Sequence, residues 1–451
     1  MAKGNRKTMR APALAPHSPA LPQEPKRPWH RRIPWWAVVV TLAVIVTAAF
    51  AAEPIRDAVT FESVGEAHLE LSPGYIALAP LSAILDTVTL LTIPQHIAVV
   101  IWIIGVYAVW RLLASSTKPN VRREVIGAAI LLDAIVVMYA AAAFLPRPMA
   151  ALTVSDETVL AADFHSHTEA SHDGRKGWTD NDVRDWHRGA GFDVAYITDH
   201  RSFSGAERGV ASNPPVAGQG TMILQGIEAV FRGEHVNILN AGRRYKGILT
   251  ADLGDVDEQA LQMASILPPT TPVLIETIPG NLDKVPAAGQ ELGSGGGVQA
   301  IEVVDGSPRG LTQSHRDRAR IDTLIGKLNL APVAGSDNHG YGRAAPAWTL
   351  MRIPGWRGMT GDSLARRIEE VLRNGRKDAT RVAERRLAES TTPTSVALAG
   401  PAVAWRMLTT LSADERVMWI VWTWAIVLLA AIVGRRRRMR ARTAPAPATA
   451  V

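Results

Sequence analysis

Long apolar stretches alternate with polar segments along the chain and give the first outline of its organisation. Four of them are about as long as a helix needs to cross a bilayer: 35–52, 97–114, 125–145 and 417–434. A fifth, 75–94, is interrupted by Pro80, Asp86 and Pro94, and we interpret it as a re-entrant or interfacial segment. The pattern predicts a membrane region at 34–149 with three transmembrane helices, and a fourth such helix near the C-terminus.

Basic residues beside these stretches predict their orientation. Clusters of Lys and Arg lie in the N-terminal tail, at 118–123 and directly after the last stretch. Because such residues accumulate on cytoplasmic loops, we expect 1–33, a disordered tail, and 435–451 in the cytoplasm. Residues 150–390 then lie on the outer side of a cytoplasmic membrane, joined to the fourth span by a linker at 391–416.

Composition restricts the partners and the type of metal site. The excess of basic residues, +7 over 451 residues, lies at the termini beside apolar stretches, so membrane topology explains it and we expect no nucleic-acid binding. The chain has no Cys, so a metal site would use His, Asp and Glu. Ala49-Phe50-Ala51 resembles a cleavage site, which leaves a cleaved signal peptide as the alternative to an uncleaved anchor.

Short β-like runs alternate with helical patterns between the third and fourth stretches. The β-like runs are 158–162, 194–197, 222–224, 236–239, 273–275, 300–304 and 331–334. The helical patterns are 180–190, 257–266, 314–328 and 362–373. This alternation predicts an α/β domain with a largely parallel sheet and crossover helices, either open or closed into a barrel.

Residues able to bind a metal ion recur where these β-like runs end. His165 and His167 follow the first run, and side chains two residues apart on an extended strand point to the same face. Asp337 and His339 form a second pair with this spacing after the last run. Other candidates near strand ends are Asp173, Asp199, His200, Glu228 and His235. Because functional residues collect at the carboxyl ends of strands in α/β sheets, we expect a metal site there.

These residues stand in short motifs that together resemble a known family. The motifs are Asp-Phe-His-Ser-His-Thr (163–168), Ser-His-Asp-Gly (171–174), Ile-Thr-Asp-His (197–200), Gly-Ile-Glu (226–228) and Gly-Ser-Asp-Asn-His (335–339). Their order and spacing resemble those of the PHP (polymerase and histidinol phosphatase) superfamily, along most of 160–380. The resemblance implies a distorted, TIM-like (β/α)7 barrel. It also implies two or three divalent ions, usually zinc, manganese or iron, and most often phosphoester hydrolysis.

The same resemblance assigns the ligands of the first two ions. His165, His167 and Asp337 would hold one ion. Glu228 would bridge this ion to a second one, which His235 would also bind.

A third ion would be held by Asp173, His200 and His339. His172 is an alternative ligand for it. Asp199 would orient a ligand from behind, or take part in catalysis directly.

One position departs from the pattern of the family. The family commonly has His-Pro after a middle strand, and that His binds the second ion, but here the sequence is Ile278-Pro279. Glu276, Glu302 or His315 would have to substitute as a ligand.

The expected chemistry is hydrolysis of a phosphate ester by a metal-bound hydroxide. Divalent ions lower the pKa of a bound water from about 15.7 to roughly 7. Arg175, Arg201 and Arg343 lie close to proposed ligands in the sequence and are candidates to bind the phosphate with planar pairs of donors. With Glu228 and Asp199 they complete the expected catalytic set.

The expected substrate is a phosphorylated small molecule, a lipid or a cell-envelope polymer, and the lipid bilayer is the other expected partner. Two alternatives remain at this point. One is metal-dependent hydrolysis of a C–N or carboxyl ester bond. The other is a metal-binding membrane sensor or scaffold without catalytic activity, which the Ile at position 278 favours.

Overall fold

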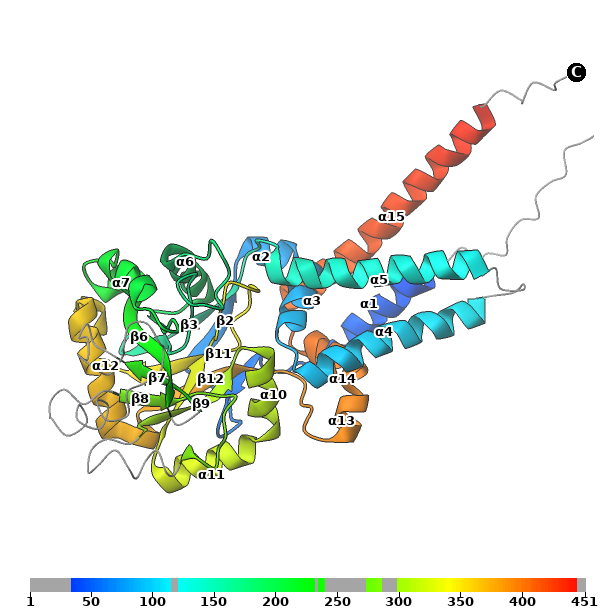
Figure 1. Cartoon of the computed structure of the whole chain (residues 1–451). Coiled ribbons are helices and arrows are strands. Elements are labelled where there is room, and N and C mark those ends of the chain that lie inside the picture. Colours follow the sequence, from blue (N-terminus) through cyan, green and yellow to red (C-terminus); the bar gives the residue numbers. More distant parts are fainter. Residues whose placement is uncertain (1–33, 115–120, 232–233, 240–272, 286–297, 444–451) are drawn as a thin grey trace, which may run out of the picture.

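An α/β part and a block of long helices make up the chain (Figure 1). This computed structural model describes residues 34–114, 121–231, 234–239, 273–285 and 298–443. The helix expected at 257–266 and the N-terminal tail lie outside the described residues. In Figure 1 the long helices extend away from the α/β part on one side.

A curved sheet of ten strands forms the centre of the α/β part. Their order across the sheet is β1 (Ile55–Asp57), β12 (Thr380–Arg385), β11 (Ala347–Arg352), β4 (Val159–Asp163), β5 (Val194–Ile197), β6 (Met222–Phe231), β7 (Glu234–Leu239), β8 (Val273–Glu276), β9 (Ala300–Asp305) and β10 (Ala331–Gly335). A separate pair joins β2 (Ala67–Leu71) to β3 (Ala150–Val154). The seven predicted β-like runs are confirmed as β4 to β10, and the α/β class is confirmed with them.

The sheet is less parallel than predicted. β4, β5 and β6 are parallel to one another, as are β8, β9 and β10, but β7 is antiparallel to both of its neighbours. β6 is longer than predicted because its second half folds back onto β7 as a hairpin. Strands β4, β5, β8, β9 and β10 are buried along their whole length, which explains their continuous apolar runs.

Helices cover the sheet, and their ends follow from local sequence. They are α6 (Asp180–Ala190), α7 (Ser204–Ala211), α10 (Pro308–Arg316), α11 (Arg318–Leu328) and α12 (Gly361–Gly375). Thr179 and Asp182 form a capping box at the start of α6. Gly191 ends α6 with a φ of 83°, where an added Cβ would meet the carbonyl oxygen of Leu152 at 2.2 Å. The single helix predicted at 314–328 is two helices, which are separated at Asp317.

The carboxyl ends of β4 and β10 meet. The Phe164 amide donates to the carbonyl of Ala334 (3.3 Å) and the Asp337 amide to that of His165 (2.9 Å). Further along, the His167 amide donates to the carbonyl of Asn338 (3.1 Å). The sheet is therefore curled into a half-barrel whose carboxyl edge is joined across β4 and β10, and the motif residues are gathered there.

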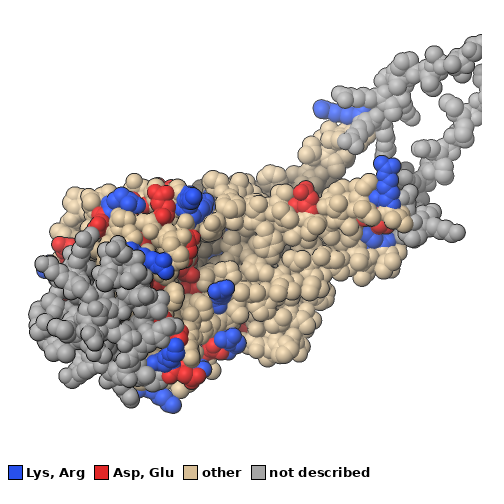
Figure 2. Space-filling view, in the orientation of Figure 1, with Lys and Arg blue, Asp and Glu red and all other residues tan. Residues whose placement is uncertain are grey.

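The helical block consists of α1 (Trp35–Ala48), α2 (Pro73–Ala77), α3 (Ala79–Thr89), α4 (Ile93–Ala114), α5 (Val121–Phe144), α13 (Pro393–Ala397), α14 (Ala399–Thr409) and α15 (Ala413–Thr443). By length and composition, α4, α5 and α15 could cross a membrane, whereas α1 has only 14 residues. Figure 2 shows few charged side chains on the visible surface of this block except towards its far end. The segment 75–94 becomes α2, α3 and the start of α4, and the linker at 391–416 contains α13 and α14.

A buried ion pair connects the helical block to the α/β part. Asp86 of α3 accepts from Nη2 of Arg147 at 2.7 Å, and both side chains are almost inaccessible to water. The other oxygen of Asp86 accepts from the hydroxyl of Tyr75 (3.0 Å) and lies 3.5 Å from Nη1 of Arg385 in β12. Asp86 therefore links α2 and α3 with the chain just before β3 and with the sheet.

Replacing Asp86 with Ala should strongly destabilise the chain. It would leave the Arg147 guanidinium buried without its carboxylate, a change that typically costs about 3–5 kcal/mol. Thermal unfolding of the detergent-solubilised chain measures the effect. The control is Glu370→Ala, which removes an exposed pair with Arg367 (2.6 Å) and should cost less than about 1 kcal/mol. Equal shifts for the two variants would contradict the role given to Asp86.

Candidate metal centre

A buried carboxylate at the end of β4 positions the segment that carries the imidazoles of His165 and His167. Oδ1 of Asp163, the last residue of β4, accepts the backbone amides of His165 (3.2 Å) and Ser336 (2.9 Å). Its Oδ2 pairs with Nε2 of His187 from α6 at 2.7 Å. Asp163 thus fixes the segments that follow β4 and β10 relative to each other, and both segments carry motif residues.

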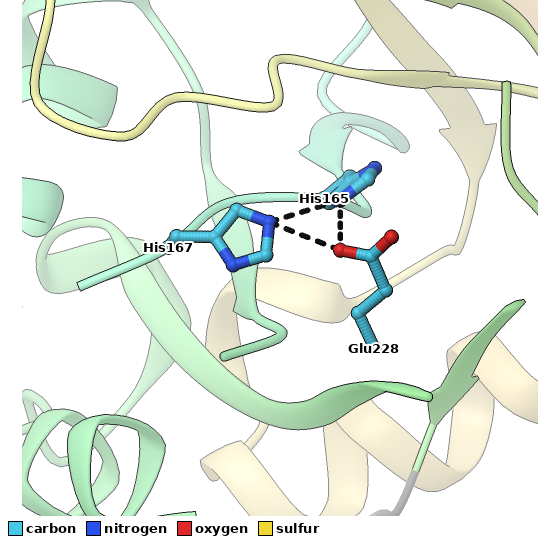
Figure 3. A group of neighbouring side chains, drawn as sticks. All are labelled: His165, His167 and Glu228. Carbon is cyan, nitrogen blue, oxygen red and sulfur yellow. Dashed lines mark hydrogen bonds and ion pairs between the residues drawn. The ribbon is translucent and has the colours of Figure 1, made fainter. Parts of the chain in front are cut away.

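The side chains of His165, His167 and Glu228 meet at the centre of the site (Figure 3), and Asp337 lies beside them. Nε2 of His165 and Nε2 of His167 lie 3.0 Å apart, and Oε2 of Glu228 lies 2.9 and 3.2 Å from them. Oδ1 of Asp337 lies 3.5 and 3.3 Å from the same two nitrogens. Ligands about 2.1 Å from one ion lie roughly 3.0–3.4 Å apart at octahedral or tetrahedral angles. The atoms of His165, His167 and Glu228 therefore fit a single divalent ion, and Asp337 lies beside the same two imidazoles.

Glu228 extends the cluster to a second group. Its Oε2 also lies 3.2 Å from Nε2 of His200, while its Oε1 lies 2.5 Å from Nδ1 of His235. Glu228 stands within β6 where that strand passes from β5 to the hairpin with β7, and His235 of β7, which is opposite Val230, reaches it from two residues along the hairpin. One carboxylate therefore offers an oxygen to each of two adjacent groups, His165–His167–Glu228 and His200–Glu228–His235.

A third group forms on the more exposed side of the cluster. Oδ2 of Asp173 lies 3.2 Å from Nε2 of His339 and 3.6 Å from Nε2 of His200. His172, the alternative ligand, is more than half exposed and lies 3.9 Å from Asp173, and it forms one of the three-residue groups together with Asp173 and His200. Nδ1 of His339 lies 3.3 Å from Asp337, whose backbone has a φ of 44°. This left-handed conformation is costly for a residue with a side chain and is found preferentially at functional sites.

The eight predicted ligands are thus brought together by the fold, in groups of three whose atoms lie within 4.8 Å of one another. These groups show how the residues could hold divalent ions.

The charges of the cluster stabilise one another. Burial opposes a charge on His165, but the carboxylates of Glu228 and Glu302 outweigh it and raise the pKa of this ring well above its usual range. Burial also lowers the pKa of His167, but the carboxylates of Asp337 and Glu228 outweigh this effect and raise the pKa to about 9. The pKa of Glu228 is correspondingly lowered, against the effect of burial, by His165 and its other imidazole neighbours. Without a cation, these rings hold protons that a metal ion would have to replace.

His200 differs from these rings because burial dominates. Burial lowers its pKa to about 4 in spite of the nearby Glu228 carboxylate. His200 is therefore neutral at physiological pH and ready to donate a lone pair to a metal.

Carboxylates behind the ligands were only partly anticipated. Nδ1 of His165 lies 2.9 Å from Oε1 of Glu302, so this ring can donate to Glu302 while its Nε2 faces the cluster. Asp305, at the end of β9, lies 3.7 Å from the same nitrogen, and its Oδ2 has no hydrogen-bond partner among the described residues. Metal-bound imidazoles usually donate to such a carboxylate, which fixes their orientation. Asp305 was not predicted as a site residue, although its position at a strand end was the available signal.

The substitutes considered for the missing His fall in different places. The side chain of Ile278 is buried in the hydrophobic core, and its amide donates to Oε2 of Glu302 (3.1 Å). Glu276 is buried, and burial raises its pKa to about 8. His315 lies on α10, and burial lowers its pKa to about 4. The charged groups that also act on this pKa are Arg318, Glu389 and Arg56, none of which is a predicted metal ligand. The group around Glu228 already has three ligands without position 278.

Asp199 supports the loop after β4. Its Oδ1 accepts from the Thr168 amide and its Oδ2 from the Thr168 hydroxyl, both at 2.6 Å. Burial raises the pKa of Asp199 despite these hydrogen bonds. Through these hydrogen bonds Asp199 holds Thr168, the residue that follows His167.

The three predicted phosphate-binding Arg residues are in different surroundings. Arg175 lies over the ring of Trp178, 5.0 Å from its centroid, and its amide donates to the carbonyl of His339. Arg201 is exposed and has a φ of 61°. Arg343 is half-buried, and its Nε donates to the carbonyl of Arg147 at 3.4 Å, on the side of the helical block. The backbone of Arg175 is therefore hydrogen-bonded directly to a predicted ligand, His339.

Comparisons with known proteins give only weak likenesses. No protein-family description and no curated protein matches the chain. Among solved structures, PsfC from Pseudomonas syringae is 18% identical over 55% of this chain and 98% of its own, with a TM-score of 0.34.

Two other solved structures have similarly low sequence identities and TM-scores. The lesion-specific endonuclease PfuEndoQ from Pyrococcus furiosus is 12% identical over 44% of this chain and 53% of its own, with a TM-score of 0.34. A protein assigned as a metal-dependent phosphoesterase from Bifidobacterium adolescentis is 16% identical over 46% of this chain and 94% of its own, with a TM-score of 0.29. Such values identify neither the family nor the activity of this chain.

Replacing Glu302 with Ala should weaken metal binding about 10- to 100-fold, the usual effect of removing a carboxylate behind a ligand His. Titration of the chelator-treated chain with Zn²⁺ or Mn²⁺ against a competing chelator measures the affinity. Glu276→Ala is the matched control, since it removes another buried carboxylate at a neighbouring strand end. An equal loss of metal affinity in Glu276→Ala would contradict the specific role given to Glu302 and would indicate that Glu276 also contributes to metal binding.

Metal affinity should increase with pH over an unusually wide range. His165 and His167 have raised pKa values, so they are protonated at neutral pH and lose these protons on metal binding. Affinity should therefore continue to increase up to about pH 9 instead of levelling near about pH 7 as for ordinary imidazoles. Calorimetric titrations in buffers of different ionisation enthalpy count the released protons. Affinity that is constant above about pH 7 would show that these rings are neutral.

Proposed function

We propose that this chain is a membrane-anchored, metal-dependent phosphate-ester hydrolase. In this proposal the α/β part is a distorted seven-stranded barrel of the PHP superfamily, made of β4 to β10. The motif order described above supports the family, and the hydrogen bonds that join the carboxyl ends of β4 and β10 support a closed arrangement.

The observation that carries the proposal is the sharing of Glu228 between two adjacent groups of ligands. One of its oxygens faces His165 and His167, and the other faces His235. A carboxylate placed in this way suits a bridge between two closely spaced ions, an arrangement common in enzymes that hydrolyse phosphate esters. When bound, such ions supply an acidic water and neutralise negative charge on the phosphoryl oxygens.

The residues of the chain have distinct tasks in this scheme. His165, His167, Glu228 and Asp337 hold their ligand atoms rigidly, because these side chains are largely buried. Glu302 keeps His165 in the orientation that directs Nε2 to the cluster. Asp173 and His339 occupy the more exposed side, where a substrate would enter, and we assign phosphate binding to the nearby Arg175.

The proposed location is a cytoplasmic membrane, with the α/β part on its outer side. The three helices that are long and apolar enough to cross a bilayer and the basic clusters beside them support this location. The substrate would then be a phosphate ester available at the outer membrane surface.

The test is metal analysis and turnover of the full chain in detergent. We expect it to retain divalent ions and to hydrolyse p-nitrophenyl phosphate or bis-p-nitrophenyl phosphate. His167→Ala and Asp337→Ala should each lower kcat/KM by roughly a hundredfold or more through loss of a metal ligand. His68→Ala, which removes an exposed histidine of β2, is the control and should have little effect.

Three outcomes would contradict the proposal. Hydrolysis of p-nitrophenyl acetate or an anilide without any phosphate ester would favour the C–N or carboxyl ester alternative. Metal retention without turnover of any substrate would favour a sensor. A folded chain that binds no metal would overturn both enzymatic hypotheses.

A further inference from the structure

A cleft connects the metal cluster to the helical block. It has a volume of about 420 Å³, and Asp173, Asp337 and His339 line one end of it. The opposite end is lined by residues of α3, α4 and α5. Whatever occupies this cleft touches both the predicted metal ligands and the helices.

The helical end of the cleft is uncharged. Its apolar side chains include Val88 of α3 and Ala142 and Ala143 of α5. The polar groups there include Nδ1 of His96 and the hydroxyl of Tyr139, which lie 3.0 Å apart and join α4 to α5. None of the described residues that α3, α4 and α5 contribute to this lining is Asp, Glu, Lys or Arg. This end suits hydrocarbon, whereas the other end suits an anionic group held by cations.

The two ends are fixed relative to each other. The amide of Gly342, in the loop after the ligand His339, donates to the carbonyl of Ala143 at 2.9 Å. In the same loop the ring of Tyr341 packs edge-on against that of Phe144, with centroids 5.7 Å apart. The ligand loop and the end of α5 therefore form one packed unit.

The helices that line the cleft also identify where its occupant comes from. α4 and α5 are two of the three described helices that are long and apolar enough to cross a membrane. His96 lies in the first turn of α4, and Ala142 lies in the last turn of α5. The cleft is therefore at the ends of these helices nearest the α/β part, where lipid head groups would lie if the helices cross a bilayer.

We infer that the substrate is an amphiphile, a phosphate ester of a long-chain alcohol or lipid. Its phosphate lies at the divalent ions that Asp173, Asp337 and His339 would help to hold, and its hydrocarbon chain lies along the helical end of the cleft, against the surface lined by Val88, Ala142 and Ala143. This inference rests on the proposed phosphate-ester hydrolase and names its substrate class. Burying each methylene in the cleft would add to binding, so affinity should increase with chain length.

The test uses alkyl phosphonates, which bind like the substrate but are not hydrolysed. Calorimetry compares dodecyl phosphonate with butyl phosphonate on the metal-loaded full chain in a non-ionic detergent. The wild-type chain should bind the dodecyl compound at least about tenfold more tightly. Ala142→Phe, which fills the helical end of the cleft, should reduce this preference to about twofold or less without changing affinity for the butyl compound.

Matched variants keep the result specific. Ala140→Phe adds the same ring to the same helix at an exposed position outside the cleft, and should keep the wild-type preference. If Ala142→Phe does not fold, Ala143→Phe replaces it, because Ala143 also lines the cleft and is less buried. Unchanged affinity for butyl phosphonate shows that the metal end is intact.

The outcomes separate this inference from the proposed function. Equal affinity for the two phosphonates in the wild-type chain, or an equal loss of preference in Ala140→Phe, would overturn the inference even if soluble phosphate esters are hydrolysed. A chain-length preference that Ala142→Phe abolishes would support the amphiphile site even if no phosphate ester is turned over, in which case the proposed hydrolase fails alone.

Discussion

The structure depends on one electrostatic constraint, the concentration of carboxylates and imidazoles at the joined carboxyl ends of the strands. Buried groups of this kind are stable only when opposite charges, protons or cations balance them. Here Glu228 and Asp337 are balanced by His165 and His167, with atoms 2.9–3.5 Å apart. These separations also suit a shared divalent ion, so the arrangement that keeps the cation-free protein stable is the one that prepares it for metal binding.

This constraint extends outward through carboxylates that touch no substrate. Asp163 ties the segment after β4 to that after β10, and Glu302 sets the orientation of His165. Asp199 holds Thr168 on the other side of His167. Asp163 and Asp199 lie at or just beyond a strand end, because parallel strands bring their carboxyl ends to one edge, whereas Glu302 lies within β9. The same architecture thus supplies both the ligands and the groups that orient them.

The helical block packs directly against the candidate site. The end of α5 packs against the loop that carries His339, and α3 is joined to the sheet through the buried Asp86. The cleft between them has ligand atoms at one end and apolar helix surface at the other. A substrate with one anionic and one hydrocarbon end would satisfy both surfaces at once.

The strands from β4 to β10 were predictable because each is a short apolar run bounded by polar residues, and α6 because its cap and αL glycine are local signals. The ligands were predictable because the motif spacing places them at strand ends. By contrast, β11 and β12 were not predicted, and nor was the antiparallel placement of β7. Strand direction and pairing depend on contacts far apart in sequence, which no local pattern records.

The sequence by itself determined which residues could bind metal, which stretches are apolar enough for a membrane, and where most strands begin. Only the tertiary structure decided which carboxylates stand behind the ligands, because Glu302 and Asp305 reach His165 across more than 130 positions of chain. It also decided that Asp86, in an interrupted apolar stretch, pairs with Arg147. Folding brings these groups together because burying a charge is favourable only beside a partner.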